Sequence, residues 1–178
     1  MHARSITVQG AIVLLAWCTA AFAPADPAVP ESALLAARKS AARMQDAAKR
    51  GDWGRVLQYT YPALVERMGG RDKAVAFMKK QSRNIKFLSV KLGEPRQAVR
   101  VGDQTIQVTL PTTVRMAGPI SQAEIDSTLL GVSRDGGRTW TFVDVQNPDQ
   151  VRAVVPDLSP ALELPARGKP RMTTPPRE

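Results

Sequence analysis

Acidic side chains in the second half of the sequence have the types and spacing that acid–base chemistry requires. The candidate catalytic residues are Glu124, Asp126 and Asp144, with Tyr59 as a hydrogen-bond donor. Glu124 and Asp126 are two positions apart and therefore share one face of a β-strand. If that face is concave and apolar, burial raises the pKa of a carboxyl group there and suits it to proton abstraction. If it is the outer face, both carboxylates are solvated.

Asp144 alternates along the chain with Trp140 and Phe142, so the same rule places it on the side of two aromatic residues. An ion pair with Arg138 is the simpler interpretation of this acid. No spacing typical of a catalytic motif surrounds the three acids. A non-catalytic protein is therefore the favoured interpretation.

Histidine and cysteine each occur once, as His2 and Cys18, near the start of the chain. Residues 11–23 form an uncharged apolar run of thirteen residues that ends in small side chains. This run is shorter than the roughly 20 residues that span a bilayer, and it is typical of a secretory signal peptide. We predict a signal peptide over 1–23, with cleavage at Ala20 or Ala25 as alternatives, and a periplasmic or secreted protein.

Cleavage at this position leaves a mature chain without histidine or cysteine. That excludes disulfides, Ser-His and Cys-His nucleophilic pairs, and metal sites built on His or Cys ligands. We expect no metal and no cofactor, and no stable membrane insertion once the signal peptide is removed.

The chain is basic, with a formal net charge of +9 over 178 residues. No basic motif with interleaved aromatic residues is present, and export separates the protein from nucleic acid, so we expect no nucleic-acid partner. Basic residues gather in and just after a predicted helix over 71–84: Arg71, Lys73, Lys79, Lys80, Arg83 and Lys86. A solvated face is the simpler interpretation of this cluster, and a docking patch for an acidic partner or an anionic lipid is the alternative.

The order of hydrophobic patterns predicts an α+β fold in one domain over 31–158. A Pro-rich linker over 24–30 precedes helical periodicity, which gives way to period-two alternation after Lys86. We expect N-terminal helices packed on one face of a curved antiparallel sheet, with a short helix after the last strand. Residues 159–178 read as a Pro-rich basic tail, extended and mobile from about Ala166.

A hairpin turn lies between the last two predicted strands. Asp135-Gly136-Gly137 suits the positive φ of a tight turn. The surrounding residues look like the Asp-box of sialidases, which is a structural motif of hairpin turns there. We expect a structural role for its side chains, with Thr139 pairing across the strands and Trp140 covering the hairpin: Ser133, Asp135, Gly137, Thr139 and Trp140.

The element order and two stretches, GDWGRVLQYTYPALVERMGG and LLGVSRDGGRTWTFVDV, resemble the nuclear transport factor 2-like superfamily. This superfamily includes SnoaL-like polyketide cyclases, ketosteroid isomerases and scytalone dehydratase. The resemblance implies a cone-shaped fold in which the sheet wraps around the helices and leaves an apolar pocket. It also implies that a homodimer formed through the outer sheet is plausible. The absence of histidine removes the dehydratase pattern.

We therefore expect an exported, non-catalytic cone-fold protein that binds a small apolar ligand or another envelope protein. The alternative is a small-molecule isomerase, cyclase or lyase that uses a pocket carboxylate with a Tyr donor. The candidate ligand-binding residues are the aromatic side chains of the domain: Trp53, Tyr59, Tyr61, Phe87, Trp140 and Phe142.

Overall fold

A computed structural model describes residues 28–173. The predicted signal peptide lies outside the described residues. The helices are α1 (Glu31–Lys49), α2 (Trp53–Val56), α3 (Pro62–Arg67), α4 (Arg71–Ser82) and α5 (Pro148–Val154). The strands are β1 (Lys86–Leu92), β2 (Gln97–Val101), β3 (Thr105–Ala117), β4 (Gln122–Ser133), β5 (Thr141–Asp144) and β6 (Arg171–Thr173).

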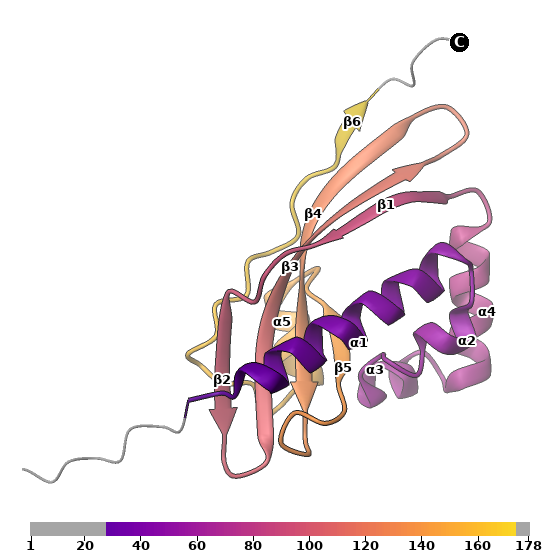
Figure 1. Cartoon of the computed structure of the whole chain (residues 1–178). Helices are drawn as coiled ribbons and strands as arrows, with labels where there is room; N and C mark the ends of the chain where they lie inside the picture. The colour runs from indigo at the N-terminus through magenta and orange to yellow at the C-terminus, as the bar shows by residue number, and fades with distance from the viewer. Residues whose placement is uncertain (1–27, 174–178) are drawn as a thin grey trace, which may run out of the picture.

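The six strands form one antiparallel sheet around two long central strands, β3 and β4 (Figure 1). β3 pairs with β1 over one half of its length and with β2 over the other half. β4 pairs in the same way with β6 at one end and β5 at the other. The predicted α+β class is confirmed. One detail differs, because β6 follows α5 and the short helix is not the last element.

The link between β1 and β2 explains why a proline stands in the middle of a central strand. Residues 93–96 connect β1 and β2, which lie in line along β3 and do not pair with each other. Pro111 lies opposite this break, where its carbonyl accepts a hydrogen bond of 2.8 Å from the Gly93 N–H. The proline nitrogen faces the same break, so no paired strand requires the N–H that proline lacks.

Helix α1 seals one face of the sheet with small side chains. Ala33, Ala37 and Ala41 are buried against Ile106, Val108, Leu110, Leu129, Trp140 and Phe142. The approach is close at the start of the helix, where a Cβ added to Gly137 would lie 2.5 Å from the Ala33 Cβ. Gly137 also has a φ of 96°, a conformation that glycine adopts without steric cost. The region that the resemblance predicts as a pocket is therefore occupied here by packed side chains.

The opposite face of the sheet carries a second core under the C-terminal part of the chain. Val151 and Val154 from α5, with Val155, Leu162 and Leu164 beyond it, pack on Leu130, Val132, Val143 and Val145. We define residues 156–173 as the strap, and Figure 1 shows it running along the sheet to β6. The residues predicted as an extended tail lie along the sheet as far as Thr173, where β6 pairs with β4.

The strap is held by side chains of the sheet that bond to its backbone. Gln107 is fully buried, and its amide donates to the Asp157 carbonyl at 2.9 Å and accepts from the Ser159 N–H at 2.9 Å. Gln97 accepts from the Glu163 N–H at 2.8 Å. Both faces of the sheet are therefore covered, one by helix α1 and the other by α5 and the strap. Among the described residues, no helix combines the length and apolar character needed to cross a bilayer.

Candidate functional site

Glu124 and Asp126 lie on the sheet face that is opposite α1. They share a face as predicted, since both bond to the same arginine of the strap. Arg171 donates from Nη2 to Glu124 Oε1 at 2.8 Å and from Nη1 to Asp126 Oδ2 at 2.7 Å. Thr113 also donates to Asp126 at 2.8 Å, and the Arg115 Nε lies 3.8 Å from Glu124.

These contacts do not give Asp126 the raised pKa that the alternative of a concave, apolar face requires. The hydrogen bond from Arg171, and next the one from Thr113, lower the pKa of Asp126 below its usual value of 3.8. The side chain is half exposed, so burial does not outweigh these contacts. Asp126 is therefore a stably ionised partner of the strap.

Asp144 lies at the end of β5, beyond the buried Trp140 and Phe142. Its carboxylate accepts a hydrogen bond from the Ser127 hydroxyl. The Arg167 Nη1 of the strap lies 3.8 Å from its other oxygen. The alternative of an ion pair with Arg138 is wrong, because in the described part of the chain the cation beside Asp144 is Arg167.

The six candidate aromatic residues are not brought together around one cavity. Trp53 and Phe87 form a tilted ring pair with centroids 6.2 Å apart. Tyr59, Trp140 and Phe142 belong to the core beneath α1. Tyr61 lies in the core on the opposite face and also lines a surface pocket.

The predicted structural turn is organised around the Asp135 carboxylate. It accepts hydrogen bonds from the Ser133 hydroxyl, the Arg138 N–H, and both the N–H and the hydroxyl of Thr139. Burial alone raises the pKa of Asp135, but the bonds from Thr139, Ser133 and Arg138 outweigh it and lower the pKa to about 2. Thr139 was expected to pair across the strands and instead closes the turn. Trp140 donates from Nε1 to the Gly137 carbonyl at 2.9 Å.

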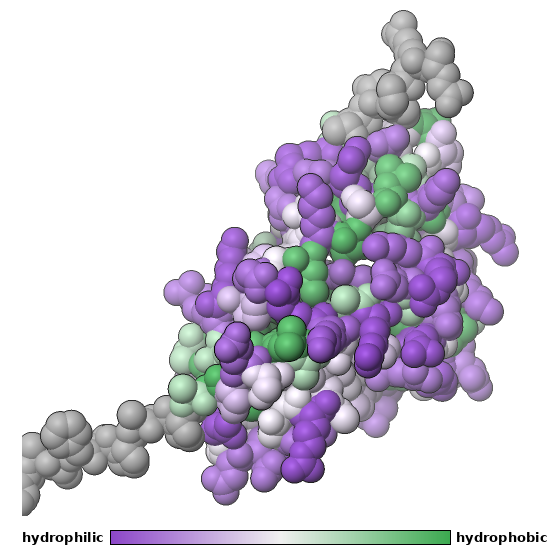
Figure 2. All heavy atoms as spheres, viewed as in Figure 1, coloured by the Kyte–Doolittle hydropathy of each residue, from purple (hydrophilic) through white to green (hydrophobic). Residues whose placement is uncertain are grey.

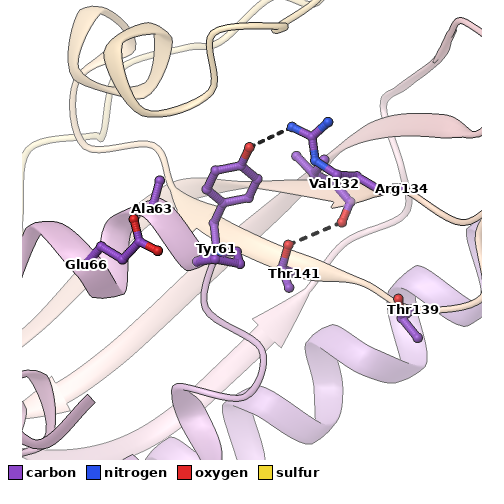
Figure 3. A pocket seen from close by; sticks show the side chains of 8 residues that line it. Tyr61, Ala63, Glu66, Val132, Arg134, Thr139 and Thr141 are labelled. Atoms are coloured by element: carbon purple, nitrogen blue, oxygen red, sulfur yellow. Dashed lines mark hydrogen bonds between the residues drawn. The ribbon is translucent and has the colours of Figure 1, made fainter. Parts of the chain in front are cut away.

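A pocket of about 360 Å³ opens between α3 and the strands β4 and β5 (Figure 3). The backbone of Tyr61 is anchored to the edge of β5, where its N–H donates to the Phe142 carbonyl at 3.0 Å. Pro62 follows at the first position of α3, where a proline costs the helix no hydrogen bond. The lining residues are Tyr61, Pro62, Ala63, Glu66, Val132, Arg134, Thr139 and Thr141.

Arg134 is the fixed cation of this pocket. Its Nη2 donates to the Tyr61 hydroxyl at 2.8 Å and to Asp157 Oδ1 at 2.9 Å, and its guanidinium carbon lies 6.0 Å from the centre of the Tyr61 ring. The hydrogen bonds to Tyr61 and Asp157 raise the pKa of Arg134, so it is charged throughout the physiological range. Glu66 contributes a carboxylate on the α3 side. A cation, a carboxylate and two threonine hydroxyls around an aromatic ring are suited to hold a small polar molecule.

Of the residues that line this pocket, sequence reasoning named Tyr61 as ligand-binding and Thr139 as part of the turn, but not Glu66 or Arg134. It also did not name Asp157, which accepts a hydrogen bond from Arg134. Arg134 occupies a position of the Asp-box-like stretch where any residue is tolerated, so no local pattern marks it. Glu66 and Asp157 are far from it in the sequence and approach it only through the fold. Within residues 28–173, no group of three or more His, Cys, Asp or Glu side chains could hold a metal ion.

Comparison with solved structures finds a similarity to a ketosteroid isomerase-like protein from Erwinia carotovora atroseptica. The two chains share 15% sequence identity with a TM-score of 0.45, over 64% of this chain and 92% of that chain. No protein-family model and no curated protein matches this chain.

Proposed function

We propose that this protein is an exported, non-catalytic binding module that takes up a small polar ligand in the pocket of Tyr61 and Arg134. The observation that carries the proposal is the positioning of Arg134 by Tyr61 and Asp157 at the wall of a cavity of about 360 Å³. These two hydrogen bonds restrict the guanidinium before a ligand arrives, which reduces the entropic cost of binding.

The donors of Arg134 indicate the chemistry of the ligand. Both of its hydrogen bonds use Nη2, and within the described part of the chain Nε and Nη1 make no further bond. A carboxylate is the ligand group that best matches these donors. Glu66 on the α3 side is suited to accept a hydrogen bond from a hydroxyl or ammonium group of the same molecule. A small hydroxy acid or amino acid has both groups.

The contacts of the candidate acids favour this proposal over the alternative of a carboxylate-dependent isomerase, cyclase or lyase. Glu124 and Asp126 are ion-paired with Arg171, and Asp144 accepts a hydrogen bond from Ser127 and lies beside Arg167. A general base needs a free carboxylate that can take a proton near neutral pH. The lowered pKa of Asp126 opposes that role.

Export remains part of the proposal on the basis of residues 1–23. N-terminal sequencing of the protein from a periplasmic extract tests it, and a mature terminus after Ala20, Ala23 or Ala25 is the expected result. Recovery of the uncleaved chain from the cytoplasmic fraction would contradict export.

Ligand uptake is tested by native mass spectrometry of the purified protein, followed by calorimetry with lactate, malate, serine and glutamate as probes. We expect a bound small molecule, or measurable binding of one probe, that is lost in Arg134→Gln. Arg138→Gln is the matched control, because Arg138 is an exposed arginine of the same turn that does not line the pocket. Thermal unfolding of both variants separates loss of binding from loss of fold.

Equal binding by the wild type and Arg134→Gln, or no binding of any probe, would contradict the pocket assignment. Asp126→Asn distinguishes the enzyme alternative. It should leave ligand binding unchanged under this proposal, and it should abolish turnover if Asp126 is a general base.

A further inference from the structure

The outer surface of α4 and the turn after it combine unpaired cations with exposed apolar side chains. We define the α4 face as Lys73, Phe77, Lys79, Lys80, Arg83 and Ile85. Phe77 and Ile85 are exposed to 52% and 39%. Lys73, Phe77 and Lys80 follow the spacing that places residues on one side of a helix. Figure 1 shows α4 at the outer margin of the helical layer, and Figure 2 shows that mostly hydrophilic residues cover this region.

The cations of this surface form no ion pair in the described structure. The ion pairs of the described residues join Arg38 to Glu94, Lys49 to Asp46, Arg115 and Arg171 to Glu124, Arg134 to Asp157, Arg167 to Asp144, and Arg171 to Asp126. None of these pairs includes a residue of the α4 face. Within residues 71–88 the one acidic residue is Asp72, in the first turn of α4.

We propose that the α4 face adsorbs to an anionic phospholipid surface, an activity separate from the Tyr61 pocket. Three of its four cations are lysines, a residue type that is depleted at protein–protein interfaces and that attracts anionic headgroups. Lysine side chains reach toward a polar surface while their alkyl stems lie along apolar groups. An exposed phenylalanine between such lysines is suited to enter the boundary between headgroups and acyl chains.

The alternative partner, a folded acidic protein, fits the same charge less well. Flexible lysines lose much side-chain entropy when they are ordered in a fixed interface, whereas a fluid headgroup layer adapts to them. A deformable anionic surface is therefore the favoured partner.

Vesicle flotation with the purified protein tests this proposal. Vesicles of phosphatidylcholine with phosphatidylglycerol are compared with vesicles of phosphatidylcholine alone. We expect binding to the anionic vesicles, weakened by added sodium chloride because salt screens the attraction. Reversal of Lys73, Lys80 and Arg83 to glutamate should lower the partition coefficient by roughly 100-fold or more, since each cation near such a surface contributes about fivefold.

The matched control reverses the same number of charges on other surfaces: Lys39, Lys91 and Arg152 to glutamate. These residues are exposed and make no ion pair in the described structure. If the control lowers binding as much as the α4 variant, net charge alone explains the binding and the assignment to this face is overturned. Absence of binding to the anionic vesicles overturns the proposal altogether, and an acidic protein becomes the partner to seek.

Phe77→Ser should bind the anionic vesicles more weakly than the wild type if the aromatic ring enters the lipid boundary. The binding that is left should still be sensitive to salt.

Discussion

The two faces of the sheet are covered by different physical means. On the α1 face, alanines of the helix contact large aliphatic and aromatic side chains of the strands with close backbone approach. On the opposite face, α5 and the first part of the strap bury valines and leucines. Polar contacts also hold the strap, from Gln107 and Gln97 along its first part and from Asp126 and Asp144 along its far part. The packing on the α1 face depends on the shapes of the side chains. The packing on the opposite face depends partly on hydrogen bonds and charge.

This difference separates global stability from local stability. Apolar burial does not depend on pH and gains most of its free energy from area removed from water. Ion pairs at an exposed strand respond to both pH and salt and contribute little to the global free energy of unfolding. We expect the α1 face to unfold with the whole domain and the end of the strap to open first.

Phe142→Ala should have the largest effect, because Phe142 is 2% exposed and lies in the centre of the α1 core. Removal of a buried aromatic ring costs about 3–5 kcal/mol in the free energy of unfolding. Urea unfolding measures the loss. Phe77→Ala is the control, because its ring is half exposed on α4, and its cost should stay within about 0.5 kcal/mol. Similar losses for the two variants would mean that Phe142 does not lie in the core.

Gln107→Ala should have an intermediate effect that begins at the strap. The substitution leaves the Asp157 carbonyl and the Ser159 N–H without their partner, at a cost of about 1–3 kcal/mol. Urea unfolding measures this cost, and trypsin should cut after Arg167 faster than in the wild type. Gln97→Ala removes one contact of the strap and should cost less. Unchanged proteolysis in Gln107→Ala would show that the strap does not depend on this residue.

Arg171→Ala should have the smallest effect on global stability and a clear local one. It removes the side chain that joins β6 to Glu124 and Asp126, so the pKa of Asp126 should rise toward its ordinary value of 3.8. In the wild type the pKa of Asp126 is lowered in the folded state. Its stabilising contribution is therefore present above pH 3.8 and is lost as the pH falls through the lowered pKa.

Nuclear magnetic resonance titration of the carboxyl groups measures this change, and amide exchange in β6 follows the opening of the strand. We expect the β6 amides of Arg171→Ala to be less protected from exchange than those of the wild type at neutral pH. In the wild type, the same loss of protection should occur only at low pH. An unchanged Asp126 titration in Arg171→Ala would contradict the assigned ion pair.

Local signals in the sequence predicted much of the element order. Asp52 caps α2 by accepting a hydrogen bond from the Arg55 N–H at 3.0 Å, as its position before Trp53 predicts. Asn147 caps α5 in the same way, with the Asp149 N–H at 2.8 Å. The alternation of β4 placed Glu124 and Asp126 on one face. These features depend on neighbours within a few residues, so the sequence contains the whole of their cause.

The position of each sheet face, the docking of the strap and the pocket of Tyr61 and Arg134 depend on contacts between distant residues. Arg171 meets Asp126 across 45 positions, and Arg134 meets Tyr61 across 73. By itself the sequence determined the α+β class, the helix caps, the turn at Asp135 and the shared face of the two acids, because each follows from local geometry. Only the tertiary structure decided which face α1 covers and which cation neutralises each acid, because side chains far apart in the chain compete for the same partners until the sheet brings some of them together.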